Sequence, residues 1–203
     1  MDFLKNVNLF SYEQYKELAE KLLASGKTTG DMQTPEIIEY TKLNMHRMKR
    51  WEKETHIIEP METFMKSLKE DYLWMVISEA WCGDAANIVP VLQKIAELSP
   101  HIELKIVLRD DNPEIMDRYL TNGTRSIPKL ICFRKNDSKE IFVWGPRPEA
   151  LQKILTEAKS KSDFSFEDFK QKIQLWYADN KSIDIQKEIL NKFKSGIAEN
   201  NNS

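Results

Sequence analysis

Residues 73–87 read Leu-Trp-Met-Val-Ile-Ser-Glu-Ala-Trp-Cys-Gly-Asp-Ala-Ala-Asn. The apolar start of this segment is typical of a buried strand, and its small and polar end predicts the first turn of a helix. Cys82 therefore lies at a strand–helix junction. It matches the first cysteine of a C-x-x-C motif, but alanine occupies position 85, where the second thiol would stand. A lone thiol cannot run an internal dithiol–disulfide cycle.

Further landmarks follow this segment in a fixed order. Pro90 comes eight residues after Cys82, Asp110-Asp111-Asn112-Pro113 ends the next predicted strand, Arg125-Ser126-Ile127-Pro128 precedes a third, and Gly145 precedes the last helix of the unit. In this order they resemble the thioredoxin superfamily over residues 60–160. The form W-C-G-D-A, with a later W-G-P-R-P, resembles a bacterial thioredoxin-like subfamily with a single active-site thiol.

Hydrophobic periodicity divides the part between 60 and 160 into alternating elements. Strands are predicted at 72–78, 102–109, 129–134 and 140–144, the last two as a hairpin. Helices are predicted at 60–69, 83–98, 113–121 and from Pro148 to 159. Strands that alternate with helices and end in a hairpin indicate an α/β fold, in which a mixed sheet carries helices on both faces. The resemblance implies the same thioredoxin-like fold.

Additional helices are predicted on both sides of this unit. Ser11 with Gln14, and Thr34 followed by proline, are helix-start signals that predict helices at 12–25 and 35–54. Two more are predicted at 166–177 and 183–194, before a disordered tail at 197–203. The chain is therefore interpreted as an N-terminal helical extension (1–59), a thioredoxin-like domain (60–160) and a C-terminal helical extension with its tail (161–203).

The overall charge argues against two classes of partner. The 203 residues include 30 Lys and Arg against 32 Asp and Glu, so no bulk field attracts nucleic acid or an anionic membrane. The N-terminus lacks a signal sequence and no apolar run is long enough to span a bilayer, which predicts a cytoplasmic protein. The three histidines have no ligand spacing, so neither a metal site nor a cofactor is expected.

The resemblance assigns roles to residues around Cys82. It implies a cis peptide bond between Ile127 and Pro128 beside the sulfur, with Trp81 as an apolar lip and Gly83 allowing close approach of a partner. The helix N-terminus favours a thiolate on a sulfur near the surface. Asp84 opposes the thiolate by like-charge repulsion. Its role is either to tune or relay a proton for Cys82 or, as an acidic first-turn residue, only to complement the helix dipole.

Other side chains complete the sequence-based site. Arg125 and Arg147 are candidates to supply positive charge near the thiol, with a solvated surface role as the alternative. Asn44 lies within an apolar helix stripe, where its amide would bond an adjoining loop or another core group. Trp176-Tyr177 is expected to be a packing anchor. Cys132 is four residues beyond Pro128, about 13 Å along a strand, too far for a disulfide with Cys82.

Two departures from the family pattern argue against dithiol chemistry. Val76 stands where the resemblance implies a buried acid, and Ile106 or Val107 stands where it implies a lysine. With Ala85, the groups that resolve a mixed disulfide are missing together. The first hypothesis is a monothiol redox protein, with Cys82 exchanging with a protein or a low-molecular-weight thiol or disulfide and an external thiol resolving it. The alternative is a non-catalytic module that binds a protein or peptide at the cis-proline edge.

Overall fold

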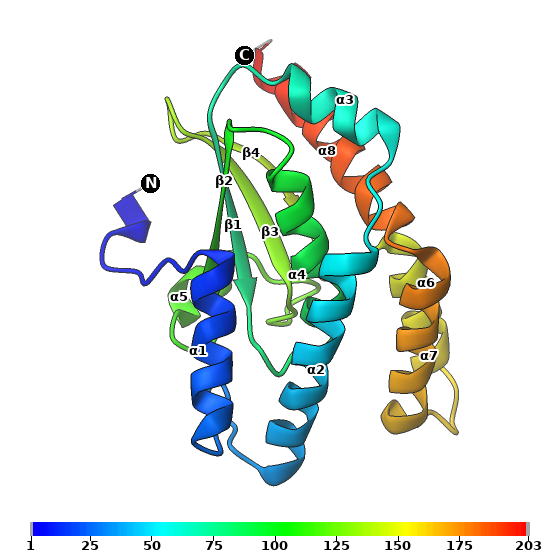
Figure 1. Cartoon of the computed structure of the whole chain (residues 1–203). Helices are drawn as coiled ribbons and strands as arrows, with labels where there is room; N and C mark the ends of the chain where they lie inside the picture. The colour runs from blue at the N-terminus through cyan, green and yellow to red at the C-terminus, as the bar shows by residue number, and fades with distance from the viewer. Residues whose placement is uncertain (1, 202–203) are drawn as a thin grey trace.

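The computed structural model describes residues 2–201 and contains one four-stranded mixed sheet. Its strands, in the order β2-β1-β3-β4, form the centre of the molecule (Figure 1). The strands are β1 (Tyr72–Ser78), β2 (Ile102–Leu108), β3 (Lys129–Arg134) and β4 (Glu140–Trp144). β1 pairs with β2 in parallel and with β3 antiparallel, and β4 pairs antiparallel with β3. The α/β, thioredoxin-like fold class predicted from the sequence is confirmed.

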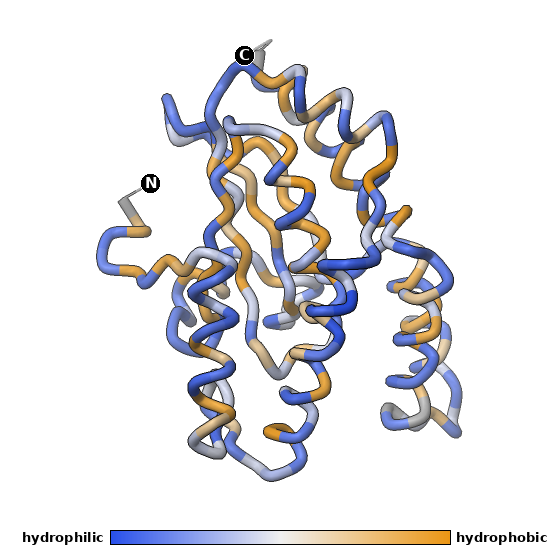
Figure 2. Tube along the Cα trace, viewed as in Figure 1, coloured by the Kyte–Doolittle hydropathy of each residue, from blue (hydrophilic) through white to orange (hydrophobic). Residues whose placement is uncertain are grey.

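The central strand explains why the sequence pattern was informative. Every residue of β1 is buried, as expected for a strand covered by helices on both faces. Val76 pairs with Ile106 on one side and with Leu130 on the other. Figure 2 shows hydrophobic residues concentrated on the strands, with hydrophilic residues on the outer helices. The core thus forms around the apolar run that precedes Cys82.

Eight α-helices surround the sheet in the described part of the chain, after a short 3-10 helix at Asp2–Leu4. They are α1 (Tyr12–Ala24), α2 (Pro35–Glu54), α3 (Glu59–Ser67), α4 (Gly83–Ala96), α5 (Pro113–Met116), α6 (Glu149–Lys159), α7 (Phe166–Asn180) and α8 (Ile183–Asn201). Ser11 and Gln14 form a capping box, Thr34 caps α2, and Pro90 lies inside α4. None of the helices described is long and apolar enough to cross a membrane.

Two of the predicted helix ends differ most from the structure, and the helix predicted at 166–177 also continues, to Asn180. The helix predicted at 113–121 ends at Met116, because the chain turns tightly farther on, with left-handed conformations at Asn122 and Gly123. The predicted tail is helical through Asn201, and positions 202–203 lie outside the described residues. α8 continues because Ile197 packs against the core.

The C-terminal helix α8 contributes to the hydrophobic core. Phe193 is fully buried, and its ring lies 4.9 Å from Tyr72, 5.2 Å from Phe142 and 6.0 Å from Trp74, measured between centroids. Gly196 lies against β4 so closely that a Cβ atom there would be 2.2 Å from the carbonyl oxygen of Ile141. The C-terminal helices are therefore part of the packed structure. The domain boundaries at 59/60 and 160/161 stay predictions.

One buried amide connects three helices beside the sheet. Asn87 on α4 accepts a hydrogen bond from Nε1 of Trp51 on α2 at 2.7 Å. Its amide nitrogen donates to the Gly83 carbonyl at 2.7 Å and to Oε1 of Gln174 on α7 at 3.1 Å. Asn87 is fully buried, so these bonds replace water completely. They place α2 and α7 on the two sides of the first turns of α4.

We expect Asn87→Ala to destabilise the protein by about 2–4 kcal/mol, because the buried Trp51 indole N–H and the half-buried Gln174 amide lose this partner. Urea denaturation followed by circular dichroism measures the change. Asn136→Ala, at an exposed position of the β3–β4 turn, is the matched control and should have almost no effect. Equal stability of the two variants would contradict this role for Asn87.

Candidate functional site

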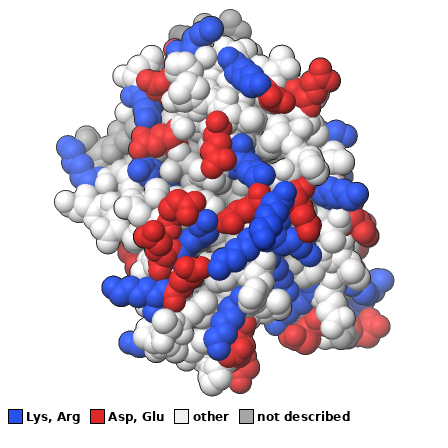
Figure 3. Space-filling view, viewed as in Figure 1, with Lys and Arg blue, Asp and Glu red and all other residues white. Residues whose placement is uncertain are grey.

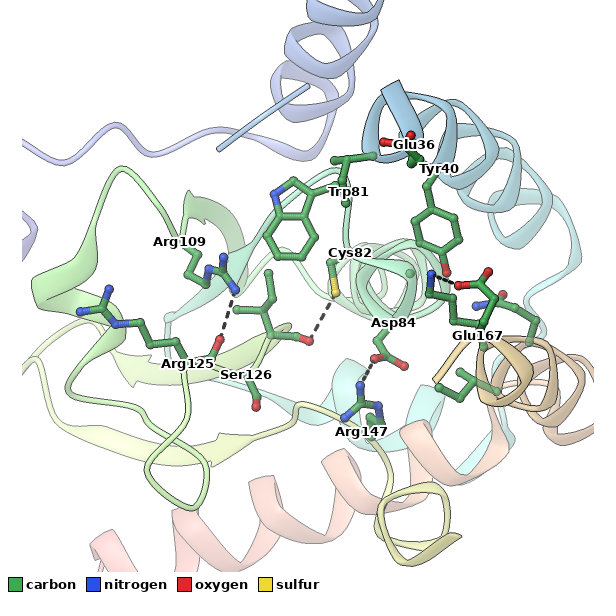
Figure 4. Close-up of a pocket in the computed structure, with 16 residues that line it drawn as sticks. Glu36, Tyr40, Trp81, Cys82, Asp84, Arg109, Arg125, Ser126, Arg147 and Glu167 are labelled. Carbon is green, nitrogen blue, oxygen red and sulfur yellow. Dashed lines mark hydrogen bonds and ion pairs between the residues drawn. The ribbon is translucent and has the colours of Figure 1, made fainter. Parts of the chain in front are cut away.

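A pocket of about 690 Å³ opens beside Cys82, where β1 meets α4 (Figure 4). Elements far apart in the sequence form its walls. From the strand–helix junction and the loops around it come Trp81, Cys82, Gly83, Asp84, Arg109, Arg125, Ser126, Ile127 and Arg147. From α2 and α7 come Glu36, Ile37, Tyr40, Glu167, Lys170, Ile173 and Gln174. The structure thus brings most of the sequence-predicted site residues to one pocket.

Cys82 caps α4 and contacts the proline loop. Its sulfur accepts a hydrogen bond from the backbone N–H of Ala85 at 3.5 Å, as a helix N-cap does. The thiol donates to the carbonyl oxygen of Ile127 at 3.4 Å. The Ile127–Pro128 bond is cis, which confirms the prediction made from the motif. The thiol and the cis-proline loop are therefore in direct contact.

The expectation of a surface sulfur with a lowered pKa was wrong. Cys82 is 8% exposed, and burial raises the pKa of its thiol from 9.0 to about 12. The carboxylate of Asp84 contributes in the same direction, while the Ala85 N–H and Arg147 oppose it with smaller effects. Burial outweighs the helix N-terminus because a thiolate would lose its hydration. Burial therefore favours the protonated thiol over the thiolate.

Asp84 is itself buried in a network of charged and polar groups. One carboxylate oxygen lies 2.5 Å from Nη2 of Arg147, and the other accepts a hydrogen bond from the Tyr177 hydroxyl at 2.9 Å. Burial raises the pKa of Asp84, and Arg147 and Tyr177 act in the opposite direction. Sequence reasoning placed Arg147 near the thiol edge but expected Tyr177 only as packing. A tyrosine gives no sequence signal for a partner 93 positions away.

The two remaining arginines lie on the other side of the cysteine, beside Trp81 (Figure 4). The Arg109 guanidinium stacks over the Trp81 ring at 4.6 Å, and its Nη1 donates to the Arg125 carbonyl at 3.4 Å. Arg109 also pairs with Asp110 at 2.7 Å, and Arg125 with Asp117 at 2.7 Å. Arg125 is thus an exposed, paired residue at the edge of the pocket, and Arg109 was not singled out from the sequence.

Glycines allow the closest approaches around the thiol. A Cβ at Gly83 would lie 2.4 Å from the hydroxyl oxygen of Tyr40, so a larger residue there would require the Tyr40 side chain to move. A Cβ at Gly145 would lie 2.5 Å from the Pro128 carbonyl oxygen, and Gly145 has φ +106°. The Gly145–Pro146 bond is also cis. The loop that carries Arg147 therefore packs directly on the cis-proline loop.

Glu79 is a buried acid that the sequence reasoning missed. It follows β1 directly, is fully buried, and accepts a hydrogen bond through Oε1 from the Asp110 N–H at 2.9 Å. Its Oε2 has no hydrogen-bond partner among the described residues. Burial raises the pKa of Glu79 to about 7. The available signal was an acidic residue between an apolar strand and Ala80-Trp81.

Two other sequence inferences can be compared with the structure. The Asn44 amide donates to the Ala80 carbonyl at 3.0 Å, so it bonds the loop before Cys82, as one of its two interpretations predicted. Cys132 is fully buried and forms no disulfide, as predicted. Val76, which stands where the resemblance implies a buried acid, is fully buried as well.

Because the Glu79 carboxyl titrates near pH 7 when folded and near 4.5 when unfolded, its contribution to stability is lost as pH rises between these values. The difference between a pKa of 4.5 and one of about 7 corresponds to roughly 3 kcal/mol. Glu79→Gln should therefore gain stability relative to the parent as pH increases from about 5 to 8. Urea denaturation at both pH values measures this. Glu157→Gln on α6 is the exposed control, and a pH-independent difference for Glu79→Gln would refute the assignment.

Arg147→Gln should destabilise the protein by about 3–5 kcal/mol, because it leaves the buried Asp84 carboxylate without its cationic partner. Adding Asp84→Asn to Arg147→Gln should recover part of this loss, since the charge is removed as well. Thermal and urea denaturation of the single and double variants measure the coupling. Additive effects of the two substitutions would argue against a direct interaction.

Known proteins resemble this chain in sequence and in fold. A thioredoxin of Chlamydia trachomatis is 31% identical over 96 residues, which cover 47% of this chain and 91% of that protein. A thioredoxin of Porphyra purpurea is 31% identical over 78 residues, covering 38% of this chain and 70% of that protein. A crystal structure of a Pseudomonas aeruginosa protein of unknown function has a TM-score of 0.57 at 15% identity, covering 92% of this chain and 98% of that one.

The likeness to the Pseudomonas aeruginosa structure shows the fold alone. Because it covers 92% of this chain, it includes the helices outside residues 60–160. The family model described as thioredoxin (Thioredoxin_9) matches residues 30–159, well over half of the chain. The match begins before α2, within the segment interpreted from the sequence as an N-terminal extension. With its cis-proline loop against Cys82, the chain belongs to the thioredoxin family.

Proposed function

We propose that this chain is a non-catalytic thioredoxin-fold binding protein, whose pocket at the cis-proline receives a ligand while Cys82 remains a thiol. The observation that carries the proposal is the state of the sulfur. It is buried, donates a hydrogen bond to the Ile127 carbonyl, and lies beside the carboxylate of Asp84. Each of these features disfavours the thiolate that disulfide exchange requires.

The surroundings of Cys82 support binding in a second way. Ala85 leaves no resolving thiol, and Cys132 is buried within β3. The pocket itself is large, and apolar side chains such as Ile37, Trp81 and Ile127 lie in its wall beside charged and polar groups, a combination that ligand-binding sites use. Binding needs such a surface but no reactive sulfur.

Monothiol exchange is the second candidate, and the position of Cys82 in the pocket wall favours it. A thiolate would attack a disulfide sulfur, forming a mixed disulfide and releasing one thiolate of the substrate. An external thiolate would then attack the substrate sulfur of the mixed disulfide, forming a new disulfide with it and releasing Cys82 as a thiolate. This route requires a ligand or a conformational change to lower the pKa of the thiol.

Alkylation separates the two candidates. A thiol pKa of about 12 instead of 9.0 reduces the thiolate fraction at neutral pH about 1,000-fold. A thiolate from a thiol of higher pKa is more nucleophilic, which recovers roughly 20- to 30-fold of the lost alkylation rate. We therefore expect iodoacetamide to modify Cys82 at least about 30-fold more slowly than free cysteine at pH 7, with a rate that still rises above about pH 9.

Mass spectrometry of the Cys82 peptide gives the rate, and Cys132 in the same sample is an internal control for unfolding. Alkylation faster than that of free cysteine, with a plateau below about pH 8, would contradict the binding proposal and favour monothiol exchange.

A further inference from the structure

The two helices beside α4 turn the cis-proline edge into a walled pocket. The Tyr40 hydroxyl of α2 packs on Gly83, next to the cysteine. Lys170 of α7 lies 5.4 Å from the centre of the Tyr40 ring, so side chains of α2 and α7 meet on this side of the thiol. Figure 4 shows Tyr40, Glu36 and Glu167 together on the side of Cys82 opposite Trp81.

Buried hydrogen bonds hold the α7 wall in place. Tyr177 donates to Asp84, and Gln174 accepts from Asn87, so two successive turns of α7 are bonded to the first turns of α4. These bonds fix α7 beside the cysteine, so the pocket has a wall on this side. The pocket volume, about 690 Å³, falls within the range typical of small-molecule sites.

The charges around the pocket are distributed unevenly. On the α7 side, Lys170 is paired with Glu167 at 2.7 Å, and beneath the thiol Arg147 is paired with Asp84. Glu36, the remaining acidic residue of the lining, also lies on the helix side (Figure 4).

The side formed by Trp81 is different. Arg109 and Arg125 line the pocket there, whereas their carboxylate partners, Asp110 and Asp117, do not. Arg109 uses Nε and Nη1 in bonds within the protein, and Arg125 uses Nε and Nη2. Each guanidinium therefore has a further Nη group for which the described residues supply no acceptor.

We infer that the pocket binds a small organic anion, with its apolar body against Trp81, Ile127 and the thiol and its acidic group at Arg109 and Arg125. The inference rests on the proposed binding function and names the class of ligand. The stacked Arg109 guanidinium is held in one orientation by Trp81, and its further Nη group, together with that of Arg125, can donate charge-assisted hydrogen bonds to a carboxylate or sulfonate. The apolar lining supplies affinity, and the arginines supply the selection for charge.

Two dyes of similar shape test this inference on the intact protein. 8-Anilinonaphthalene-1-sulfonate carries an acidic group, and N-phenyl-1-naphthylamine has nearly the same apolar body without it. We expect the sulfonate to bind about 10-fold more tightly, as measured by fluorescence titration, and to protect Cys82 from alkylation. Arg109→Gln and Arg125→Gln should each weaken the sulfonate about 10-fold and leave the neutral dye unchanged.

Arg50→Gln on α2, away from the pocket, is the matched control for loss of one positive charge and should bind both dyes as the parent does. Any one of four results would overturn the inference. These are equal binding of the two dyes, no binding of the sulfonate, no protection of Cys82 from alkylation, and a loss of sulfonate binding in the Arg50 variant equal to that in the Arg109 and Arg125 variants. Slow alkylation of Cys82 together with any of these results would leave the binding proposal standing and reject only the ligand class.

Discussion

The buried ion pair between Asp84 and Arg147 is the interaction on which the rest of the site depends. A carboxylate that leaves water loses several kcal/mol of hydration energy, and it is tolerated only where other groups replace its contacts. Here the guanidinium comes from the loop after β4 and the hydroxyl of Tyr177 comes from α7. The negative charge in the first turn of α4 therefore requires both segments to be in place, and it couples the C-terminal helices to the sheet.

The same pair also affects the thiol, although burial has the larger effect. In a site that stabilises a thiolate, positive charge acts on the sulfur directly. In this protein Arg147 is paired with Asp84, and the Asp84 carboxylate repels a thiolate on Cys82. Burial raises the pKa of the thiol further and has the larger effect. The cysteine keeps its proton and its contact with Ile127. The family geometry around the cis-proline is thus present without the electrostatics of a reactive thiol.

Charge elsewhere on the molecule is balanced. Figure 3 shows basic and acidic side chains interspersed on the face that it presents, with no large area of one sign, in keeping with 30 basic and 32 acidic residues. The uneven distribution at the pocket is therefore local. It arises because Asp110 and Asp117 approach their arginines from outside the pocket wall.

Most of the fold could be predicted because the strands are marked by patterns of neighbouring residues in the chain. β1 is an uninterrupted apolar run, and the hairpin of β3 and β4 surrounds a polar turn, so three of the four strands had their observed limits. The cis peptide bond before Pro128 was predictable from its motif. Helix ends were less predictable: α5 stops at Met116 and α8 continues to Asn201, because a tight turn and packing against β4 decide them.

The amino-acid sequence by itself determined the order of elements, the place of Cys82 at the end of β1 and the absence of a second thiol beside it. Only the tertiary structure decided that the sulfur is buried, that Glu79 is a buried acid, and that α2 and α7 form the walls of the pocket. The physical reason is the range of the interactions. Strand patterns and caps depend on neighbours in the chain, whereas hydration and charge pairing depend on groups such as Tyr177 that folding brings from far away.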